Sequence, residues 1–130
     1  MARVLALVPD LLFGSRLQGS LTAAGHEVEL IGQEAGLRDR LADAGAPAAA
    51  VLVVDLTDAS FDGAGLTESL ARGGALGQMR TLAFYAHVDS TVRERAEQAG
   101  FDLVVPRSRM AREGAELITR LAGSDRASGG

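Results

Sequence analysis

The chain has 130 residues, a hydrophobic fraction of 47% and a formal net charge of −4 at pH 7. This length and composition are typical of one globular domain with a packed core, and they exclude a largely disordered chain. The absence of cysteine excludes disulfides, thiolate metal sites and a cysteine nucleophile, and an acidic domain with one Tyr and no Trp is a poor candidate for direct nucleic-acid binding.

The first half of the chain alternates between strand-like and helix-like patterns. The run VLALV, residues 4–8, is typical of a strand buried on both faces. Apolar residues at helical spacing follow it and predict a helix that stops at Gly25. Residues 26–32 alternate polar and apolar, which favours a short strand near the edge of a sheet. A second helix is indicated by Leu37, Leu41 and Ala44.

The second half contains three more apolar runs that predict strands, over residues 50–56, 81–87 and 102–106. Residues 62–77 suggest a helix that a glycine-rich end weakens, whereas residues 90–100 have a clear helical stripe. A last helix is marked by the spacing of Met110, Leu117, Ile118 and Leu121.

Five strand–helix units imply an α/β fold with a parallel sheet covered by helices on both faces. At this length we expect a flavodoxin-like three-layer sandwich with the strand order 2-1-3-4-5 and right-handed crossovers. One domain is expected over residues 1–122, followed by a flexible tail over residues 123–130.

Polar residues follow the central strands of this predicted sheet, where ligands of such folds sit. Asp10 and Asp55 follow adjacent strands, so we expect their carboxylates to face one another across a crevice. Such a pair can bind a divalent cation, or one carboxylate can accept a phosphoryl group. The crevice residues expected from this rule are Asp10, Thr57, Tyr85, Ala86, His87 and Arg107.

Several segments resemble the receiver domain of bacterial response regulators, and the resemblance covers about residues 3–122. LVVDLTD resembles the strand that ends in the phosphoaccepting Asp of that family, which places Asp55 in that role. RTLAFYAHVD resembles the fourth strand, with Tyr85 at the hydroxyl position and Ala86 at the small residue. AGFDLVVPRS resembles the segment around the family's Lys-Pro pair, where this chain has Arg107 and Ser108.

The chain also departs from the receiver pattern at the residues that carry its chemistry. The family has an acidic pair after the first strand to hold Mg²⁺, whereas this chain has Pro9 and then Asp10. We therefore expect Mg²⁺ to bind weakly, if at all, through Asp10 and Asp55, and we expect no other cofactor. Arg107 can contact a phosphate, but its planar fork does not imitate a lysine ammonium. Tyr85 is bulkier than the family's Thr or Ser.

Each of these residues also has a purely structural interpretation. Asp55 can cap a loop or pair with Arg107, and Asp10 can cap the helix that follows it. His87 can be an ordinary loop residue at the end of its strand. The arginines near Arg107 can form a solvated face paired with acids.

The leading functional expectation is a stand-alone atypical receiver, or pseudo-receiver, in the bacterial cytoplasm. It is not an enzyme and does not contact a membrane; it acts by binding a signalling protein, with little or no dependence on phosphorylation. By analogy with receivers, a homodimer is also consistent with the sequence. The expected contact surface spans the fourth helix, fifth strand and fifth helix, with Val92, Arg95, Ala99, Arg109, Arg112 and Glu113.

Two alternatives stay open at the level of sequence. The chain can be a phospho-receiver in which Asp55 is phosphorylated and Arg107 contacts the phosphate. It can instead be a binder of a nucleotide or another small molecule in the crevice at the ends of the first and third strands.

Overall fold

Strands and helices alternate strictly along the computed structural model, which describes residues 2–86 and 90–123. The elements in chain order are β1 (Arg3–Leu7), α1 (Leu11–Ala23), β2 (Glu27–Ile31), α2 (Glu34–Ala42), β3 (Val51–Asp55), α3 (Gly63–Arg72), β4 (Arg80–Tyr85), α4 (Ser90–Gln98), β5 (Leu103–Pro106) and α5 (Arg107–Gly123).

The five strands form one parallel sheet in the order β2-β1-β3-β4-β5. The predicted fold class and strand order are therefore confirmed. The alternating strand β2 lies at an edge of the sheet, as its pattern indicated, and the continuous apolar strands β1 and β3 lie inside it.

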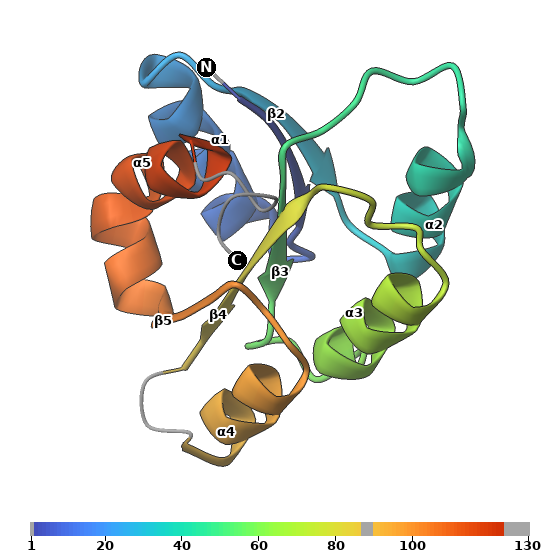
Figure 1. Cartoon of the computed structure of the whole chain (residues 1–130). Coiled ribbons are helices and arrows are strands. Elements are labelled where there is room, and N and C mark those ends of the chain that lie inside the picture. Colours follow the sequence, from blue (N-terminus) through green and yellow to red (C-terminus); the bar gives the residue numbers. More distant parts are fainter. Residues whose placement is uncertain (1, 87–89, 124–130) are drawn as a thin grey trace.

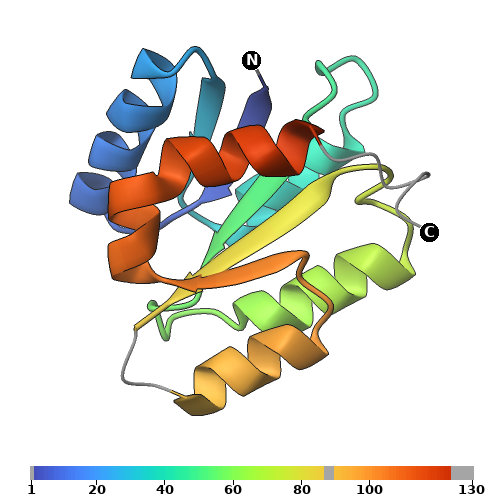
Figure 2. The ribbon, with the colours of Figure 1, turned by 60° about the vertical axis from the view of Figure 1, so that its left-hand side comes forward.

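Helices cover both faces of this sheet (Figure 1). Leu17 of α1 and Leu117 of α5 pack with Val4 and Val53 on one face. Leu37 of α2, Leu70 of α3 and Ala96 of α4 belong to the core on the other face, together with alternate residues of the same strands. Figure 2 shows α5 lying across its face of the sheet beside α1. The period of two along each strand thus divides the apolar residues between two cores.

Several boundaries differ from the expected ones. Helix α2 ends at Ala42, because Asp43 has an extended backbone (φ −81°, ψ 100°), so Ala44 lies outside it. The segment with the weak helical pattern does form α3, because the Asp62 side chain accepts a hydrogen bond from the backbone N–H of Gly65. The glycines that weakened the pattern follow that helix.

The start of α5 matters most for the site. The sequence marked the last helix from Met110 onward, but α5 begins at Arg107, directly after Pro106. Proline is tolerated beside a helix start, where the first N–H groups have no intrahelical partner. Arg107 is therefore held by a strand on one side and a helix on the other. Within the described residues, no helix is long and apolar enough to cross a membrane.

Candidate functional site

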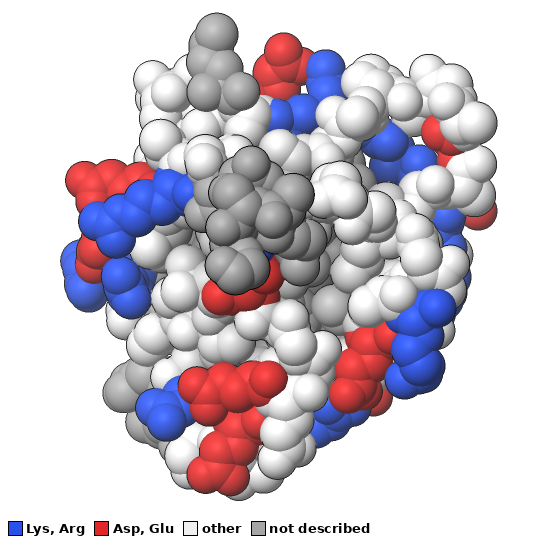
Figure 3. All heavy atoms as spheres, in the orientation of Figure 1, with Lys and Arg blue, Asp and Glu red and all other residues white. Residues whose placement is uncertain are grey.

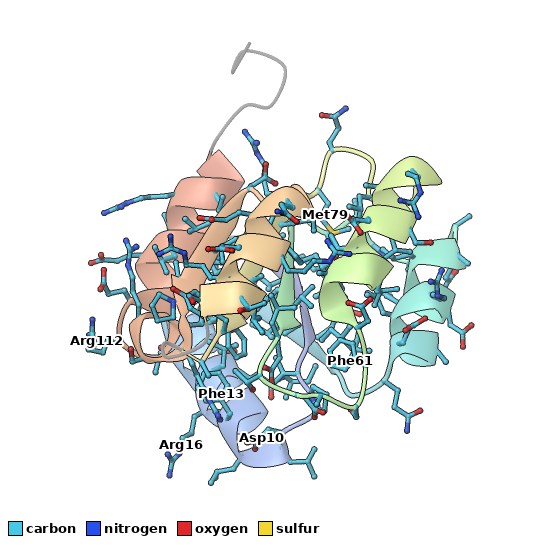
Figure 4. All side chains as sticks on the ribbon, turned by 90° about the horizontal axis from the view of Figure 1, so that it is seen from below. Asp10, Phe13, Arg16, Phe61, Met79 and Arg112 are labelled. Atoms are coloured by element: carbon cyan, nitrogen blue, oxygen red, sulfur yellow. The ribbon has the colours of Figure 1, made fainter. Side chains whose placement is uncertain are left out.

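The carboxyl ends of the strands form one edge of the sheet, and Figure 4 looks onto that edge. Asp10 and Phe13 lie there at the start of α1, with Phe61 across from them before α3. Asp55 ends β3, and Arg107 begins α5. Strand register places Asp55 opposite Phe84 of β4. The polar residues selected from the sequence therefore do converge on one edge.

Asp55 is buried, with only 1% of its surface exposed. One of its carboxylate oxygens, Oδ1, accepts hydrogen bonds from the backbone N–H of Thr57 at 2.7 Å and from the Thr57 hydroxyl at 2.6 Å. Burial raises the pKa of Asp55, while the Thr57 bonds and the positive charge of Arg107 act in the opposite direction. The expected structural role of Asp55, closing the loop after β3, is present in the structure.

Asp10 is the N-cap residue of α1, as its structural interpretation predicted. Its Oδ1 accepts hydrogen bonds from the backbone N–H groups of Leu12 at 2.9 Å and Phe13 at 3.0 Å. Its Oδ2 accepts a hydrogen bond from Nη2 of Arg107 at 3.2 Å. The bond from the Phe13 N–H is the largest influence that lowers the pKa of Asp10. Both oxygens of this carboxylate are therefore engaged by the protein itself.

Arg107 also lies over an aromatic ring. Its guanidinium carbon is 4.2 Å from the centroid of Phe13, which is within the range of a cation–π contact. The ring of Phe13 in turn lies 5.0 Å from that of the fully buried Phe84. The alternative pairing of Arg107 with Asp55 is not the one formed; Asp10 takes that place.

Phe13 is the site residue that sequence reasoning missed. Its position in the apolar stripe of the predicted helix assigned it to the core, and it does pack against that core. A single aromatic residue near the start of a helix was the available signal. Its contact with Arg107 joins residues 94 positions apart, and no local pattern indicates such a contact.

The remaining crevice residues differ in accessibility. Tyr85 is 6% exposed at the end of β4, so most of its ring is in the core. Ala86 is exposed and lies outside the strand, which ends two residues earlier than expected. Thr57 is half-buried beside Asp55. His87 lies outside the described residues.

Comparison with solved structures identifies this arrangement. The receiver domain of a Francisella response regulator covers 94% of this chain and 97% of its own length at 13% identity, with a TM-score of 0.80. A response regulator from Thermotoga maritima covers 95% of this chain and 99% of its own length at 13% identity, with a TM-score of 0.78. A CheY-like receiver domain protein from Methanospirillum hungatei covers 94% of each chain at 16% identity, with a TM-score of 0.76. The chain has the receiver fold. No family model and no curated relative matches the sequence.

The receiver resemblance implies a Mg²⁺ ion in this crevice, but the residues present do not fit one. Asp10 already accepts three hydrogen bonds, two of them as the cap of α1. Across residues 2–86 and 90–123, no group of three or more carboxylate or imidazole side chains is arranged to hold a metal ion. Of the two expected metal ligands, Asp10 therefore caps α1, and Asp55 closes the loop after β3.

The six residues expected on one contact surface lie on α4, directly after it, and on α5. Val92 and Arg95 line a groove of about 390 Å³ between α3 and α4, and Arg95 donates a hydrogen bond to Glu68 of α3 at 2.6 Å. Ala99 is half-buried against the core. Val92 and Arg95 share the side of α4 that carries the buried Ala96, because spacings of three and four residues return to one helix face, and Ala99 follows the last residue of that helix.

On α5, Arg109 and Arg112 each lie 3.6 Å from Glu113. Figure 3 shows Arg side chains beside Asp and Glu side chains across this view of the surface, without a field of one sign. The contact surface made of these six residues, and its role in binding a partner, stay predictions.

Proposed function

We propose that this chain is a receiver-like signalling module that acts by binding a protein partner in the cytoplasm, without enzymatic activity and without a requirement for phosphorylation of Asp55. The observation that carries the proposal is the state of Asp55. Asp55 is 1% exposed and its carboxylate is bonded to Thr57, while the nearby cation Arg107 is bonded to Asp10.

Phosphoryl transfer to a carboxylate needs two things from a protein. The attacking oxygen must be accessible in line with the donor, and preorganised positive charge must meet the phosphoryl oxygens. Asp55 offers little accessible surface. Arg107 must first leave Asp10 and the ring of Phe13. Both features support a function that does not depend on the phosphoryl group.

The test compares partner binding by the wild-type chain and by Asp55→Asn. Asn keeps an oxygen that can accept both Thr57 bonds but cannot form an acyl phosphate. A partner identified by cross-linking in the native host is purified, and its dissociation constant is measured by calorimetry. We expect the two constants to agree within about twofold, which is about 0.4 kcal/mol. A loss of about tenfold or more in Asp55→Asn would contradict the proposal.

One observation favours the phospho-receiver as a second candidate. Arg107 is near enough for its charge to lower the pKa of Asp55, so a phosphoryl group on Asp55 would lie within its electrostatic reach. Titration with beryllofluoride and Mg²⁺, followed by amide NMR shifts, separates the candidates. Saturable shifts at Thr57 that vanish in Asp55→Asn support the phospho-receiver, and their absence supports the proposed module.

The third candidate places a nucleotide or another small molecule in the crevice at the ends of β1 and β3, where the cation Arg107 is already bonded to Asp10. The groove between α3 and α4 has one cationic side chain among its lining residues, Arg95, and that group is already bonded to Glu68. A phosphate entering there would meet the carboxylates of Asp58 and Asp62.

A further inference from the structure

We infer that Arg107 is the resident cation of this crevice: bonded to Asp10 and stacked on Phe13, it neutralises the carboxylates there and keeps divalent metal ions from binding. The inference deepens the proposed function, because it rests on the same receiver-like crevice. The charge of the carboxylates in that crevice is then balanced by a side chain of the protein and not by a metal ion.

The crevice contains several carboxylates, whose negative charges favour a cation beside them. Asp10, Asp55 and Asp58 lie within electrostatic reach of one another at this edge of the sheet: the charge of Asp10 acts on Asp58, and the charges of Asp58 and Arg107 act on Asp55. Arg107 is the cation that meets these carboxylates, and it makes a direct bond to Asp10. Without the guanidinium, Asp10 would lose its ionic bond and Asp55 would lose the nearby positive charge.

Two contacts and the junction between β5 and α5 hold Arg107 in this place. Its Nη2 donates to Asp10, whose other oxygen is fixed by the first turn of α1. Its guanidinium lies on the ring of Phe13, which is positioned by Phe84. Its backbone has no loop to move in, because α5 follows β5 directly. Phe13 is thus a positioning residue for Arg107.

The same contacts oppose a metal ion. A divalent cation on Asp10 would have to displace a guanidinium and compete with two cap hydrogen bonds. Mg²⁺ also loses its bound water reluctantly and demands near-octahedral oxygen ligands. Repulsion between Mg²⁺ and the nearby guanidinium adds to this cost, because both are positive.

The test is a Mg²⁺ titration of the intact chain and of Arg107→Gln, followed by the amide NMR shifts of Phe13 and Thr57. We expect no saturable shift in the wild type up to about 20 mM Mg²⁺, and saturable binding at least about tenfold tighter in Arg107→Gln, because the crevice has then lost its cation. Arg109→Gln is the matched control. It removes the same charge from the same helix but from a residue paired with Glu113, and it should behave like the wild type.

Two results would overturn the inference: saturable Mg²⁺ binding at these amides in the wild type, or no gain in Arg107→Gln. Arg107→Lys serves as a second variant should the Gln variant fail to fold. It keeps the charge but loses the planar stacking, and it should bind Mg²⁺ more tightly than the wild type. A Lys variant that excludes Mg²⁺ as fully as Arg would overturn the role of Phe13. No partner is present, so failure of the partner test leaves this result unaffected.

Discussion

At the scale of single residues, Asp55 shows how the fold treats an ionisable group on a buried strand. Asp55 is buried in the sheet, away from water, and its carboxylate accepts two hydrogen bonds from Thr57 in the next loop. Hydrogen bonds to a carboxylate favour its charged form, whereas burial opposes it. Burial is the larger influence here, so the pKa of Asp55 is raised. The ionised side chain therefore opposes folding near neutral pH.

We expect Asp55→Asn to be more stable than the wild type at pH 7. A carboxyl whose pKa is higher in the folded than in the unfolded chain stabilises the fold fully below the unfolded value, about 3.9. That stabilisation is lost as the pH rises through the folded pKa. The difference between the variants should therefore grow from acid toward neutral pH. Urea unfolding at a series of pH values measures it. A wild type that gains stability relative to Asp55→Asn as the pH rises would refute this assignment.

Asp10 has two separable roles, and two substitutions distinguish them. Asp10→Asn keeps a side-chain oxygen for the N–H groups of Leu12 and Phe13 but loses the ionic bond to Arg107. Asp10→Ala loses both. We expect the Ala variant to have clearly the lower melting temperature, because N-cap oxygens stabilise helices more than exposed ion pairs do. Equal melting temperatures for the two variants would show that the cap bonds contribute little.

At the scale of elements, a histidine joins the end of α5 to the start of the sheet. His26 is buried, and its Nδ1 accepts a hydrogen bond from the backbone N–H of Ala2 at 3.0 Å. Its Nε2 lies 3.0 Å from the hydroxyl of Thr119, which itself donates to the carbonyl of Ala115. Nε2 is therefore the donor of the pair and Nδ1 the acceptor. One side chain thus connects α5 with the start of β1.

We expect His26→Ala to lower the free energy of unfolding by about 2–3 kcal/mol, because it leaves the buried Ala2 N–H without its acceptor and opens a cavity. Urea unfolding gives the value. Thr119→Val provides the comparison, since it removes the hydroxyl at the exposed end of the same connection and should cost less. A larger loss in Thr119→Val than in His26→Ala would contradict this ranking.

Gly100, two residues after the end of helix α4, has a backbone conformation that suits no other residue well. Gly100 has φ +91°, and a Cβ there would meet no atom within 4 Å. We expect Gly100→Ala to cost about 1 kcal/mol, through backbone strain alone. Gly73, which ends α3 with φ −81°, is the matched control, and Gly73→Ala should be near neutral. Thermal unfolding of both variants tests this, and equal melting temperatures would contradict the strain argument.

At the scale of the whole molecule, one sheet separates two apolar cores. Leu117 of α5 belongs to one core and Leu70 of α3 to the other. The strands between them contribute alternate residues to each core, so neither core can form without the same backbone. We therefore expect the described fold to unfold as one cooperative unit.

Leu117→Ala and Leu70→Ala test this expectation. Each should lower the free energy of unfolding by about 2–5 kcal/mol, since each deletes a buried leucine side chain. Both should move the midpoint of a single urea transition without changing its slope, and the double variant should show nearly the sum of the two losses. A second transition in either variant would show that the two cores unfold separately.

The sequence was sufficient for the architecture because its signals are local. The continuous run at residues 51–54 and the alternation of β2 indicate buried and edge strands. The strand order was the one expected for five strand–helix units in a chain of this length. The cap role of Asp10 was also predictable from its position before a helix. These features depend on neighbours in the chain.

The site was less predictable because its contacts join distant residues. The bond between Asp10 and Arg107 spans 97 positions, and the choice between Asp10 and Asp55 as the partner depends on where α5 begins. The side of α4 that faces α3 is set by packing, so Val92 and Arg95 could not be placed in a groove from sequence. Tertiary packing decides such matters.

The direct junction between β5 and α5 attaches the first residue of that helix to the sheet. Its 17 residues extend about 25 Å from Arg107, at 1.5 Å per residue. The near end is fastened to α1 through Asp10, and the far end is fastened near the start of the sheet through Thr119 and His26. Release of Arg107 from Asp10 would leave the near end of the helix held by β5 and by the fully buried Met110. The change would then be confined to the side chains at the carboxyl edge of the sheet, while the helix keeps its place.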